Sequence, residues 1–215
     1  MKKLLQISLA LTALAGASTM ALAQDVAAGQ KKVAMCIGCH GIPGYQSSFP
    51  EVYKVPMISG QNAKYIVASL SAYAKGERKH PTMRGIALSL SDQDMADIAA
   101  FYEQHGKGAP APEQVREPSA QVKELLNKGA CISCHGANFS KPIDGSYPKI
   151  AGQHADYLYA ALKSYQAEGN PVVGRSNAIM AGQVKQFSTA ELKAMAAYLA
   201  SLPGELKTVP QSRLR

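Results

Sequence analysis

The pattern Cys-x-x-Cys-His occurs twice in this chain, and the two copies contain every cysteine of the sequence. The first copy comprises Cys36, Cys39 and His40, and the second comprises Cys131, Cys134 and His135. Two thiols one helical turn apart can bond to the vinyl groups on one edge of a porphyrin, and the adjacent imidazole can bind the iron as its proximal ligand. The sequence therefore predicts two covalently bound haem c groups.

Three other uses of paired cysteines fit less well. A disulfide in an oxidising compartment would not require a histidine after each pair. A zinc site usually has its second pair about 15–20 residues from the first, whereas Cys36 and Cys131 lie 95 positions apart. A thioredoxin-like motif needs alternating strands and helices around it, and these surroundings look helical. Haem attachment is the interpretation that accounts for both cysteines and the following histidine in each motif.

Aligning the two motifs brings much of the chain into register, which indicates a duplication. Pro56, Ile58, Gly60 and Gln61 correspond to Pro148, Ile150, Gly152 and Gln153, and Tyr65, Leu70 and Tyr73 correspond to Tyr157, Leu162 and Tyr165, all 92 positions apart. Beyond an expected turn near Gly76 and Gly169 the offset becomes 97, pairing Leu90 and Ser91 with Phe187 and Ser188. Such changes of offset indicate insertions in loops, where they are tolerated.

Met83 and Met180 occupy equivalent positions of this repeat, before the last helix of each half, where a loop could bring a thioether over the iron. We predict that they are the sixth ligands of the two irons, because Met/His ligation is a common arrangement in electron-transfer haem proteins. The other methionines fit a role as core filler. His80, His105 and His154 have no histidine partner in the other half, so surface or hydrogen-bonding roles are expected for them, with His80 in a loop.

Each half reads mainly as helix, and no convincing alternating strand is present. Helices are expected over residues 26–36, 63–75 and 95–103, and over residues 120–131, 155–167 and 192–201. Ser91-x-x-Asp94 and Ser188-x-x-Glu191 resemble capping boxes at the start of the last helix of each half. The predicted fold class is all-α, with two tandem domains related by duplication, which the resemblance given below identifies as class I cytochrome c domains.

The N-terminus has the features of a secretory leader. Lys2 and Lys3 precede a short apolar run, and Ala21-Leu22-Ala23 is a small-residue cleavage site, so cleavage after Ala23 and export to the periplasm are expected. The apolar run is too short for a good membrane span. The predicted division is a leader at 1–23, domains at 24–106 and 118–203, a Pro/Ala-rich linker at 107–117 and a tail at 204–215.

The formal net charge is +8 at pH 7, and the basic residues are spread along the chain without a dense run. Nucleic-acid binding is therefore a weak interpretation. A mild positive balance suits docking on an acidic protein face, although a solvated surface explains it equally well. We expect a monomer whose partners are redox proteins, with peripheral association with membrane complexes as a further option.

With these motifs in place, the chain resembles the dihaem cytochrome c4 family of class I c-type cytochromes over about residues 24–203. The resemblance implies two haem domains packed about a pseudo-twofold axis, with electrons passed toward a terminal oxidase or a similar periplasmic acceptor. It also implies that the carbonyl groups of Pro56 and Pro148 orient His40 and His135, as such bonds do around metal-bound histidines. The insert at 44–55 and the tail after Pro203 depart from the family and leave partner choice open.

The function that follows is outer-sphere electron transfer between respiratory chain components, without a catalysed reaction. A peroxidase-like or thiosulfate-oxidising haem enzyme is one alternative, and it needs an open or displaceable ligand at one iron. Matched methionines in both halves argue against such a site. A dedicated cytochrome subunit of a dehydrogenase is the other alternative.

Overall fold

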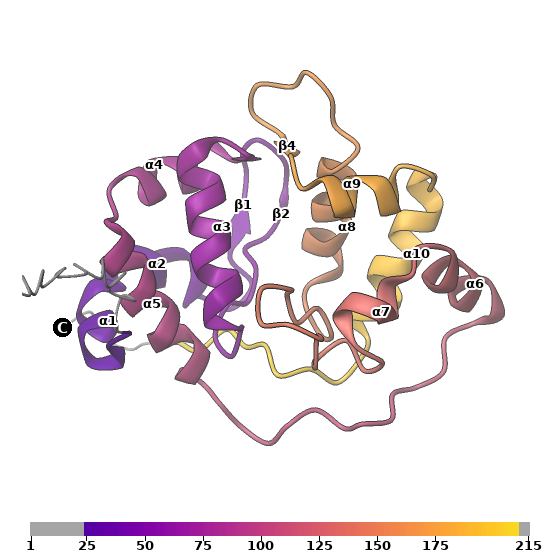
Figure 1. Ribbon diagram of the computed structural model, residues 1–215, viewed down its shortest axis with the longest axis horizontal. Helices are drawn as coiled ribbons and strands as arrows, with labels where there is room; N and C mark the ends of the chain where they lie inside the picture. Colours follow the sequence, from indigo (N-terminus) through magenta and orange to yellow (C-terminus); the bar gives the residue numbers. More distant parts are fainter. Residues whose placement is uncertain (1–23, 211–215) are drawn as a thin grey trace, which may run out of the picture.

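The structure is a computed structural model that describes residues 24–210 of the chain, and the predicted leader and the end of the tail lie outside the described residues. The chain forms two helical halves that lie side by side (Figure 1). The first half contains α1 (Val26–Lys32), α2 (Ala34–His40), α3 (Ala63–Lys75), α4 (Pro81–Leu88) and α5 (Asp92–Gln104). The second contains α6 (Ala120–Lys128), α7 (Cys131–His135), α8 (Ala155–Ser164), α9 (Ala178–Val184) and α10 (Thr189–Ala200).

The predicted all-α class is confirmed, and several helices begin where local chemistry places them. Helix α3 spans the residues expected from the sequence. Helices α5 and α10 both begin at capping boxes, because the hydroxyls of Ser91 and Ser188 accept from the backbone N–H of Asp94 and Glu191, whose carboxylates accept in return. The last helix of each half is therefore fixed at its start by the same four-residue signal.

The helices that carry the Cys-x-x-Cys-His motifs differ from the expected continuous ones. In the first half the helix breaks at Val33, which is 1% exposed and separates α1 from α2. In the second half α6 ends at Lys128, and Ala130 takes a left-handed conformation with φ 47° before α7 begins. Each motif thus lies on its own short helix, which a break in the helical conformation separates from the helix before it.

Two short helices and four strands were not predicted. Helices α4 and α9 occupy the segments that the sequence analysis treated as loops. Strands β1 (Gln46–Ser47) and β2 (Tyr53–Lys54) form a hairpin inside the insert, and β3 (Arg78–Lys79) pairs antiparallel with β4 (Gly174–Arg175) of the other half. Each strand has two residues, which is too short for an alternating pattern to show.

Each half has its own apolar core. In the first, α1 packs closely on α5, and a Cβ atom added at Gly29 would overlap the carbonyl oxygen of Asp97. The Asp97 carboxylate, 3% exposed, accepts from the backbone of Asp25 at 3.0 Å and pairs with the Lys32 ammonium at 2.6 Å. In the second, Leu192 in the first turn of α10 is fully buried. Each half therefore has the packed interior of a separate domain.

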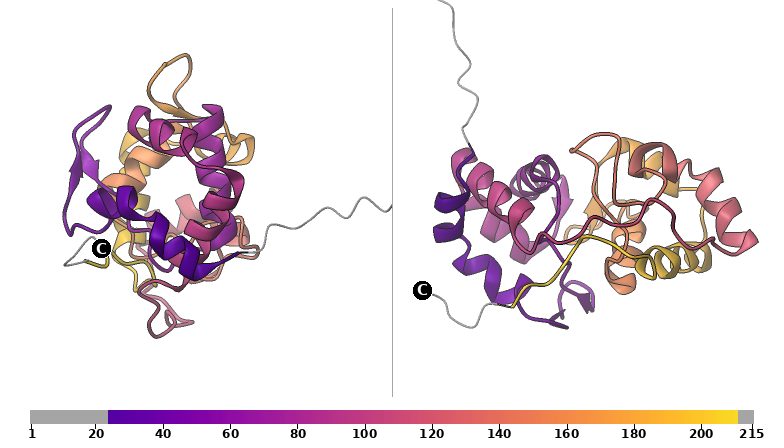
Figure 2. Two further views of the ribbon diagram at one scale, coloured as in Figure 1. Left: turned by 90° about the vertical axis from the view of Figure 1, so that its left-hand side faces the viewer. Right: turned by 90° about the horizontal axis from the view of Figure 1, so that it is seen from below.

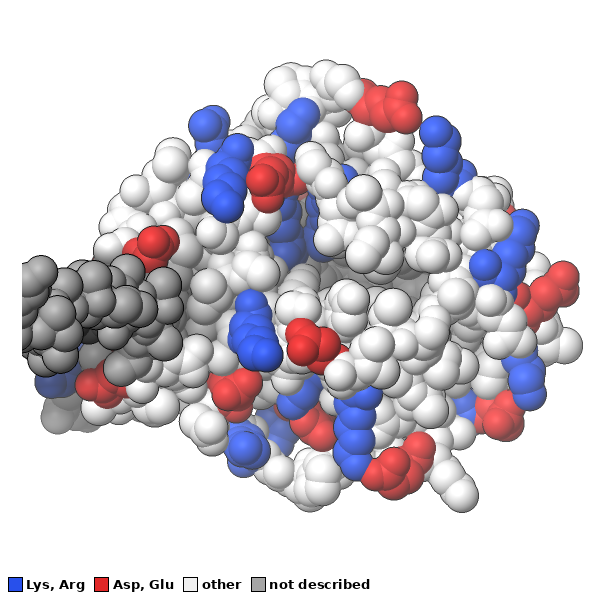
Figure 3. Space-filling view, viewed as in Figure 1, with Lys and Arg blue, Asp and Glu red and all other residues white. Residues whose placement is uncertain are grey.

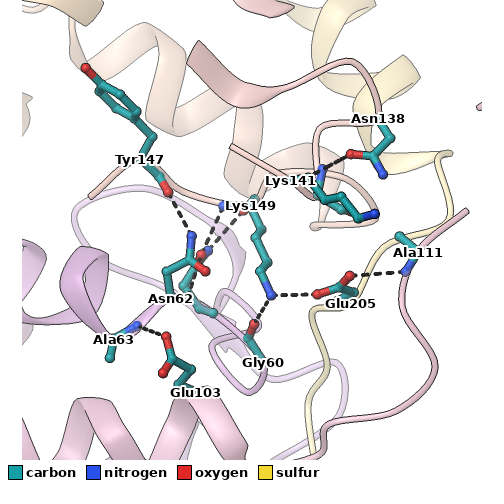
Figure 4. Close-up of polar contacts among 12 residues, drawn as sticks. Gly60, Asn62, Ala63, Glu103, Ala111, Asn138, Lys141, Tyr147, Lys149 and Glu205 are labelled. Carbon is teal, nitrogen blue, oxygen red and sulfur yellow. Dashed lines mark hydrogen bonds and ion pairs between the residues drawn. The ribbon is translucent and has the colours of Figure 1, made fainter. Parts of the chain in front are cut away.

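Residues 107–119, which join the halves, contain no helix or strand, and they run along one side of the molecule (Figures 1 and 2). The segment after α10 returns to the first half, where the backbone N–H of Lys207 donates to the carbonyl of Ser59 at 3.0 Å. Glu205 of this segment accepts from the backbone of Ala111 at 3.1 Å and pairs with Lys149 at 2.6 Å (Figure 4). The tail thus contacts both halves and the linker, while the exact domain boundaries stay a prediction.

Two equivalent glutamines join the halves directly. The Gln153 side chain accepts from the backbone N–H of Met57 at 3.0 Å and donates to its carbonyl at 2.8 Å. The Gln61 side chain does the same with Lys149, at 2.9 and 3.0 Å. Both glutamines are 4% exposed. Because Met57 and Lys149 are themselves equivalent in the repeat, the exchange has the symmetry of a pseudo-twofold axis.

Lys, Arg, Asp and Glu side chains are interspersed over the face shown in Figure 3, and no single sign of charge dominates it. None of the helices within residues 24–210 is both long and apolar enough to cross a bilayer.

Candidate functional site

The two motif histidines have the same environment in both halves. Nδ1 of His40 lies 2.8 Å from the carbonyl oxygen of Pro56, and Nδ1 of His135 lies 3.0 Å from that of Pro148. Since a carbonyl can only accept, each Nδ1 carries the proton, and Nε2 keeps the lone pair that a metal requires. Burial lowers the pKa of both imidazoles more than the hydrogen bond to the proline carbonyl raises it. Both rings therefore stay neutral near pH 7.

The motif cysteines are half-buried, and none of the four forms a disulfide. Cys36 and Cys39 lie on α2, one turn apart, and Cys131 and Cys134 have the same relation on α7. Burial raises the pKa of Cys36 and of Cys131 to about 11, so neither thiol is set up as a reactive thiolate. Within the described residues the cysteine pairs do not join a cluster of three or more His, Cys, Asp or Glu side chains that could hold a metal ion.

The two candidate methionines lie in short helices and not in the loops that were expected. Met83 is in the first turn of α4 and Met180 is in the first turn of α9. The backbone N–H of Met83 donates to Nδ1 of His80 at 3.3 Å, and that of Met180 donates to the side-chain oxygen of Asn177 at 3.0 Å. His80, expected in a loop without a specific role, is therefore the N-cap of the helix that carries Met83, and Asn177 is its counterpart.

The remaining histidines have structural contacts. The His105 ring stacks on Phe101 with centroids 4.6 Å apart, and its Nδ1 lies 3.0 Å from the hydroxyl of Ser59. His154 is the N-cap residue of α8, and its backbone N–H donates to the Gln153 side chain at 3.0 Å. These contacts fit the structural and hydrogen-bonding roles expected for them.

A cavity of about 460 Å³ extends through both halves. The motif histidines, both candidate methionines and three of the four cysteines line it, namely Cys39, His40, Met83, Cys131, Cys134, His135 and Met180. Its walls are largely apolar, with Ile66 and Leu70 from α3 and Leu158 and Leu162 from α8. An imidazole, a thioether and paired thiols around an apolar space are the donor set and the surroundings that haem c requires.

The structure also brings to this cavity a polar cluster that the sequence analysis missed. Arg78 of β3 and Arg175 of β4 line the cavity together with Tyr157 of α8. A signal was available, because the two arginines lie 97 positions apart, the same offset that relates Met83 to Met180. The two arginines nevertheless come together only because β3 pairs with β4 of the other half, and the local sequence of either strand does not indicate this pairing.

Comparisons with known proteins agree with this arrangement. The family model for cytochrome c matches residues 26–105 and again residues 119–203. Cytochrome c4 of Pseudomonas aeruginosa is 32% identical over 207 residues, covering 92% of this chain and 96% of that protein. The thiosulfate dehydrogenase electron acceptor of Thiomonas intermedia is 28% identical, covering 87% of this chain and 88% of that protein.

A solved structure also indicates the cytochrome c4 family. The crystal structure of reduced recombinant cytochrome c4 from Pseudomonas stutzeri matches with a TM-score of 0.64 and 30% identity, covering 84% of this chain and all of that one. With the duplicated cytochrome c match, these relatives show that the chain belongs to the cytochrome c4 family, as a dihaem electron carrier with two covalently bound haem c groups.

Proposed function

We propose that this protein carries electrons in the periplasm between components of a respiratory chain, toward a terminal oxidase. The observation that carries the proposal is the equivalence of the two halves around the cavity. Each half supplies a histidine with its Nδ1 proton held by a proline carbonyl and a methionine at the start of a capped helix. A carrier needs such closed, matched ligation, whereas an enzyme needs an open position at one metal.

The proposed haem sites follow from these positions. Cys36 and Cys39 would attach the first haem, and His40 and Met83 would bind its iron. Cys131 and Cys134 would attach the second, and His135 and Met180 would bind its iron. The carbonyls of Pro56 and Pro148 fix the orientation of the two imidazoles, so that each Nε2 would be held ready to bind an iron.

In this mechanism the haem supplies an iron that alternates between ferric and ferrous. The protein contributes fixed surroundings. The apolar walls keep water from the metal, and the neutral imidazoles and the thioethers stay in place in both states. The soft methionine sulfur favours the ferrous state and so raises the reduction potential.

Export completes the proposal. The leader at residues 1–23 would be removed after Ala23, and the mature chain would act as a monomer at the membrane surface. An intact-mass measurement of protein from the periplasmic fraction tests export and cleavage, since the expected mass is that of residues 24–215 plus two haems. A mass that includes residues 1–23 would contradict the predicted cleavage.

A second candidate function, as the electron acceptor of a dehydrogenase, has specific support. Two similar proteins are thiosulfate dehydrogenase electron acceptors, those of Thiomonas intermedia and Stutzerimonas stutzeri. The second candidate role is therefore to accept electrons from one periplasmic dehydrogenase, whereas the first is a general role in a respiratory chain. In both roles the protein itself carries electrons and leaves the substrate chemistry to its partner.

Rapid mixing distinguishes these roles. Reduced protein is mixed with membrane vesicles of the source organism, and its reoxidation in air is followed in the visible spectrum. Reoxidation that cyanide blocks supports delivery to a terminal oxidase. Oxidised protein is separately mixed with periplasmic extract, with and without thiosulfate. Reduction that depends on thiosulfate supports the acceptor role, and failure of both exchanges would contradict the proposed function.

A further inference from the structure

The loop that follows the motif histidine differs between the two halves. In the first half, Pro56 lies 16 positions after His40. In the second half, Pro148 lies 13 positions after His135. The longer loop folds into the β1–β2 hairpin, whereas the shorter one, residues 136–147, contains no helix or strand. The hairpin lies at the boundary between the halves, with β2 beside α8 (Figure 1). The two otherwise matched domains therefore differ at this place.

The hairpin forms one wall of the cavity. Tyr45, Phe49 and Tyr53 line the cavity together with His40. The rings of Tyr45 and Phe49 belong to neither apolar core, and the two side chains are 43% and 57% exposed. In the shorter loop of the second half, the cavity is lined by the two residues that precede the proline, at 146–147. The cavity thus has a large aromatic cover on the side of the first half and a much smaller one on the side of the second.

Helix α8 of the second half holds the hairpin in place. The backbone N–H of Lys54, at the end of β2, donates to the Asp156 carboxylate at 3.0 Å, a charge-assisted hydrogen bond. The Glu51 carboxylate, just before β2, pairs with the Lys163 ammonium at 2.5 Å. These contacts attach both ends of β2 to the other half. The position of the hairpin over the cavity therefore depends on the docking of the two halves.

We infer that the hairpin at residues 44–55 is a cover for the haem of the first half, held closed by α8 of the second half, and that it raises the reduction potential of the first haem alone. The inference rests on the haem positions proposed above, because His40 and the hairpin rings line the same cavity. Tyr45 and Phe49 supply the flat apolar surface on which a porphyrin packs. Solvent exposure of the cofactor is one of the features by which a protein sets a reduction potential.

The sign of the effect follows from solvation. Ferric iron carries one more positive charge than ferrous iron, and water stabilises the more highly charged state. A drier site therefore favours the ferrous state and raises the potential. Removing the cover should lower the potential of the first haem. The haem of the second half has no matching cover to lose, so its potential should stay the same.

The test compares Phe49→Ser with Val52→Ser, which changes a side chain of the same hairpin that is 71% exposed and does not line the cavity. The potential of each haem is measured from its methyl resonances in NMR spectra at successive stages of reduction. Contacts with Leu70 or Leu162, which line the cavity from α3 and α8, assign the resonances to one half. Because Phe49 lies outside both apolar cores, its replacement should not prevent folding.

The expected result is that Phe49→Ser lowers the potential of the first haem and leaves that of the second unchanged, while Val52→Ser changes neither. Equal shifts of both haems in Phe49→Ser, or a shift no larger than that of Val52→Ser, would overturn the cover. Absence of covalent haem from the parent protein would instead contradict the proposed function.

The double variant Glu51→Gln/Asp156→Ala tests the attachment to α8. It removes two negative charges, and this change of charge alone would raise the potentials. Release of the hairpin would instead lower the potential of the first haem, so the two effects have opposite signs. The Val55 N–H, which donates to the Tyr45 carbonyl at 2.8 Å within the hairpin, gives an independent measurement by hydrogen exchange. We expect a lower first potential and faster exchange at Val55. A rise in both potentials, or unchanged exchange, would overturn the attachment.

Discussion

Two chemically different residues cap equivalent helices in the two halves. The Nδ1 of His80 and the side-chain oxygen of Asn177 each accept the backbone N–H of the methionine three positions later. A histidine can replace an asparagine here because its neutral ring offers an acceptor at a similar reach. The two helices thus begin in the same way although the capping residue differs, which is why His80 has no histidine counterpart in the other half.

Replacing His80 tests this capping role. His80→Ala is expected to lower the free energy of unfolding by about 1 kcal/mol, because it leaves the first turn of α4 without an acceptor. His80→Asn copies the other half and should recover most of that loss. Denaturant titrations of the holoprotein measure both variants. Equal losses in His80→Ala and His80→Asn would contradict the capping role.

Asp97 gives a prediction about pH. Its hydrogen bond to Lys32, followed by that to Gln93, lowers the pKa of this carboxyl in the folded protein. The ionised form therefore contributes stability above the unfolded pKa of about 4, and this contribution is lost as the pH falls through the lower folded value. Asp97→Asn should remove this part of the acid dependence, whereas Asp92→Asn, at an exposed position of α5, should leave it largely intact. Stability curves between neutral and acidic pH provide the measurement, and parallel curves for the parent and Asp97→Asn would contradict the assignment.

At the scale of elements, the tight contact between α1 and α5 depends on a residue without a side chain. A Cβ atom at Gly29 would overlap the Asp97 carbonyl and would approach Cβ of Phe101 at 2.9 Å. Both neighbours belong to the packed face of α5, so neither can move without shifting that helix. The two helices can lie this close only while position 29 is glycine.

Gly29→Ala is therefore expected to destabilise the protein by about 1–3 kcal/mol, the usual cost of overpacking. Gly85→Ala, in α4 with open space around its Cβ position, should instead raise stability by about 0.5–1 kcal/mol, since alanine is the better helix former. Chemical denaturation of the two variants measures the difference. A Gly29→Ala protein as stable as the parent would show that α1 and α5 do not pack this closely.

The sequence predicted some elements well because their signals are local. The capping boxes at Ser91 and Ser188 mark the starts of α5 and α10, and the helical spacing of tyrosines and leucines gave α3. Helix α4 was missed although Pro81 stands at its first position, a common start signal. The β3–β4 pair could not be predicted, because two-residue strands exist only once the halves have met. The haem attachment motif could also be predicted, because its residues are neighbours in the sequence. The contact between Arg78 and Arg175 could not, because it depends on the pairing of the two halves.

At the scale of the whole molecule, the Pro-x-Ile-x-Gly-Gln segments have a second role besides their proline carbonyls. Their glutamines, Gln61 and Gln153, exchange paired hydrogen bonds with the backbone of the opposite half. The sequence showed that the segments correspond, but nothing in it indicated that each glutamine contacts the other copy. The same segments thus position the imidazoles and hold the two halves together.

Gln153→Leu should cost about 1–3 kcal/mol, because it leaves the half-buried N–H and carbonyl of Met57 without their side-chain partner. If the halves are coupled through this exchange, the double variant Gln61→Leu/Gln153→Leu should unfold in two separate transitions. Gln104→Leu, at an exposed position, is the control and should change little. Calorimetry resolves the transitions, and a single cooperative transition in the double variant would contradict this role.

The central claim is that both irons are held by a histidine and a methionine. The far-red absorption band of oxidised protein, which arises from methionine sulfur bound to ferric iron, tests it most directly in the parent, in Met83→His, in Met180→His, in the double variant and in Met57→Leu. We predict that each single histidine variant loses about half of the parent intensity, since one of two equivalent methionine ligands is removed. The double variant should lose the band and Met57→Leu should keep it. A band missing from the parent, or unchanged in either single histidine variant, would contradict the account.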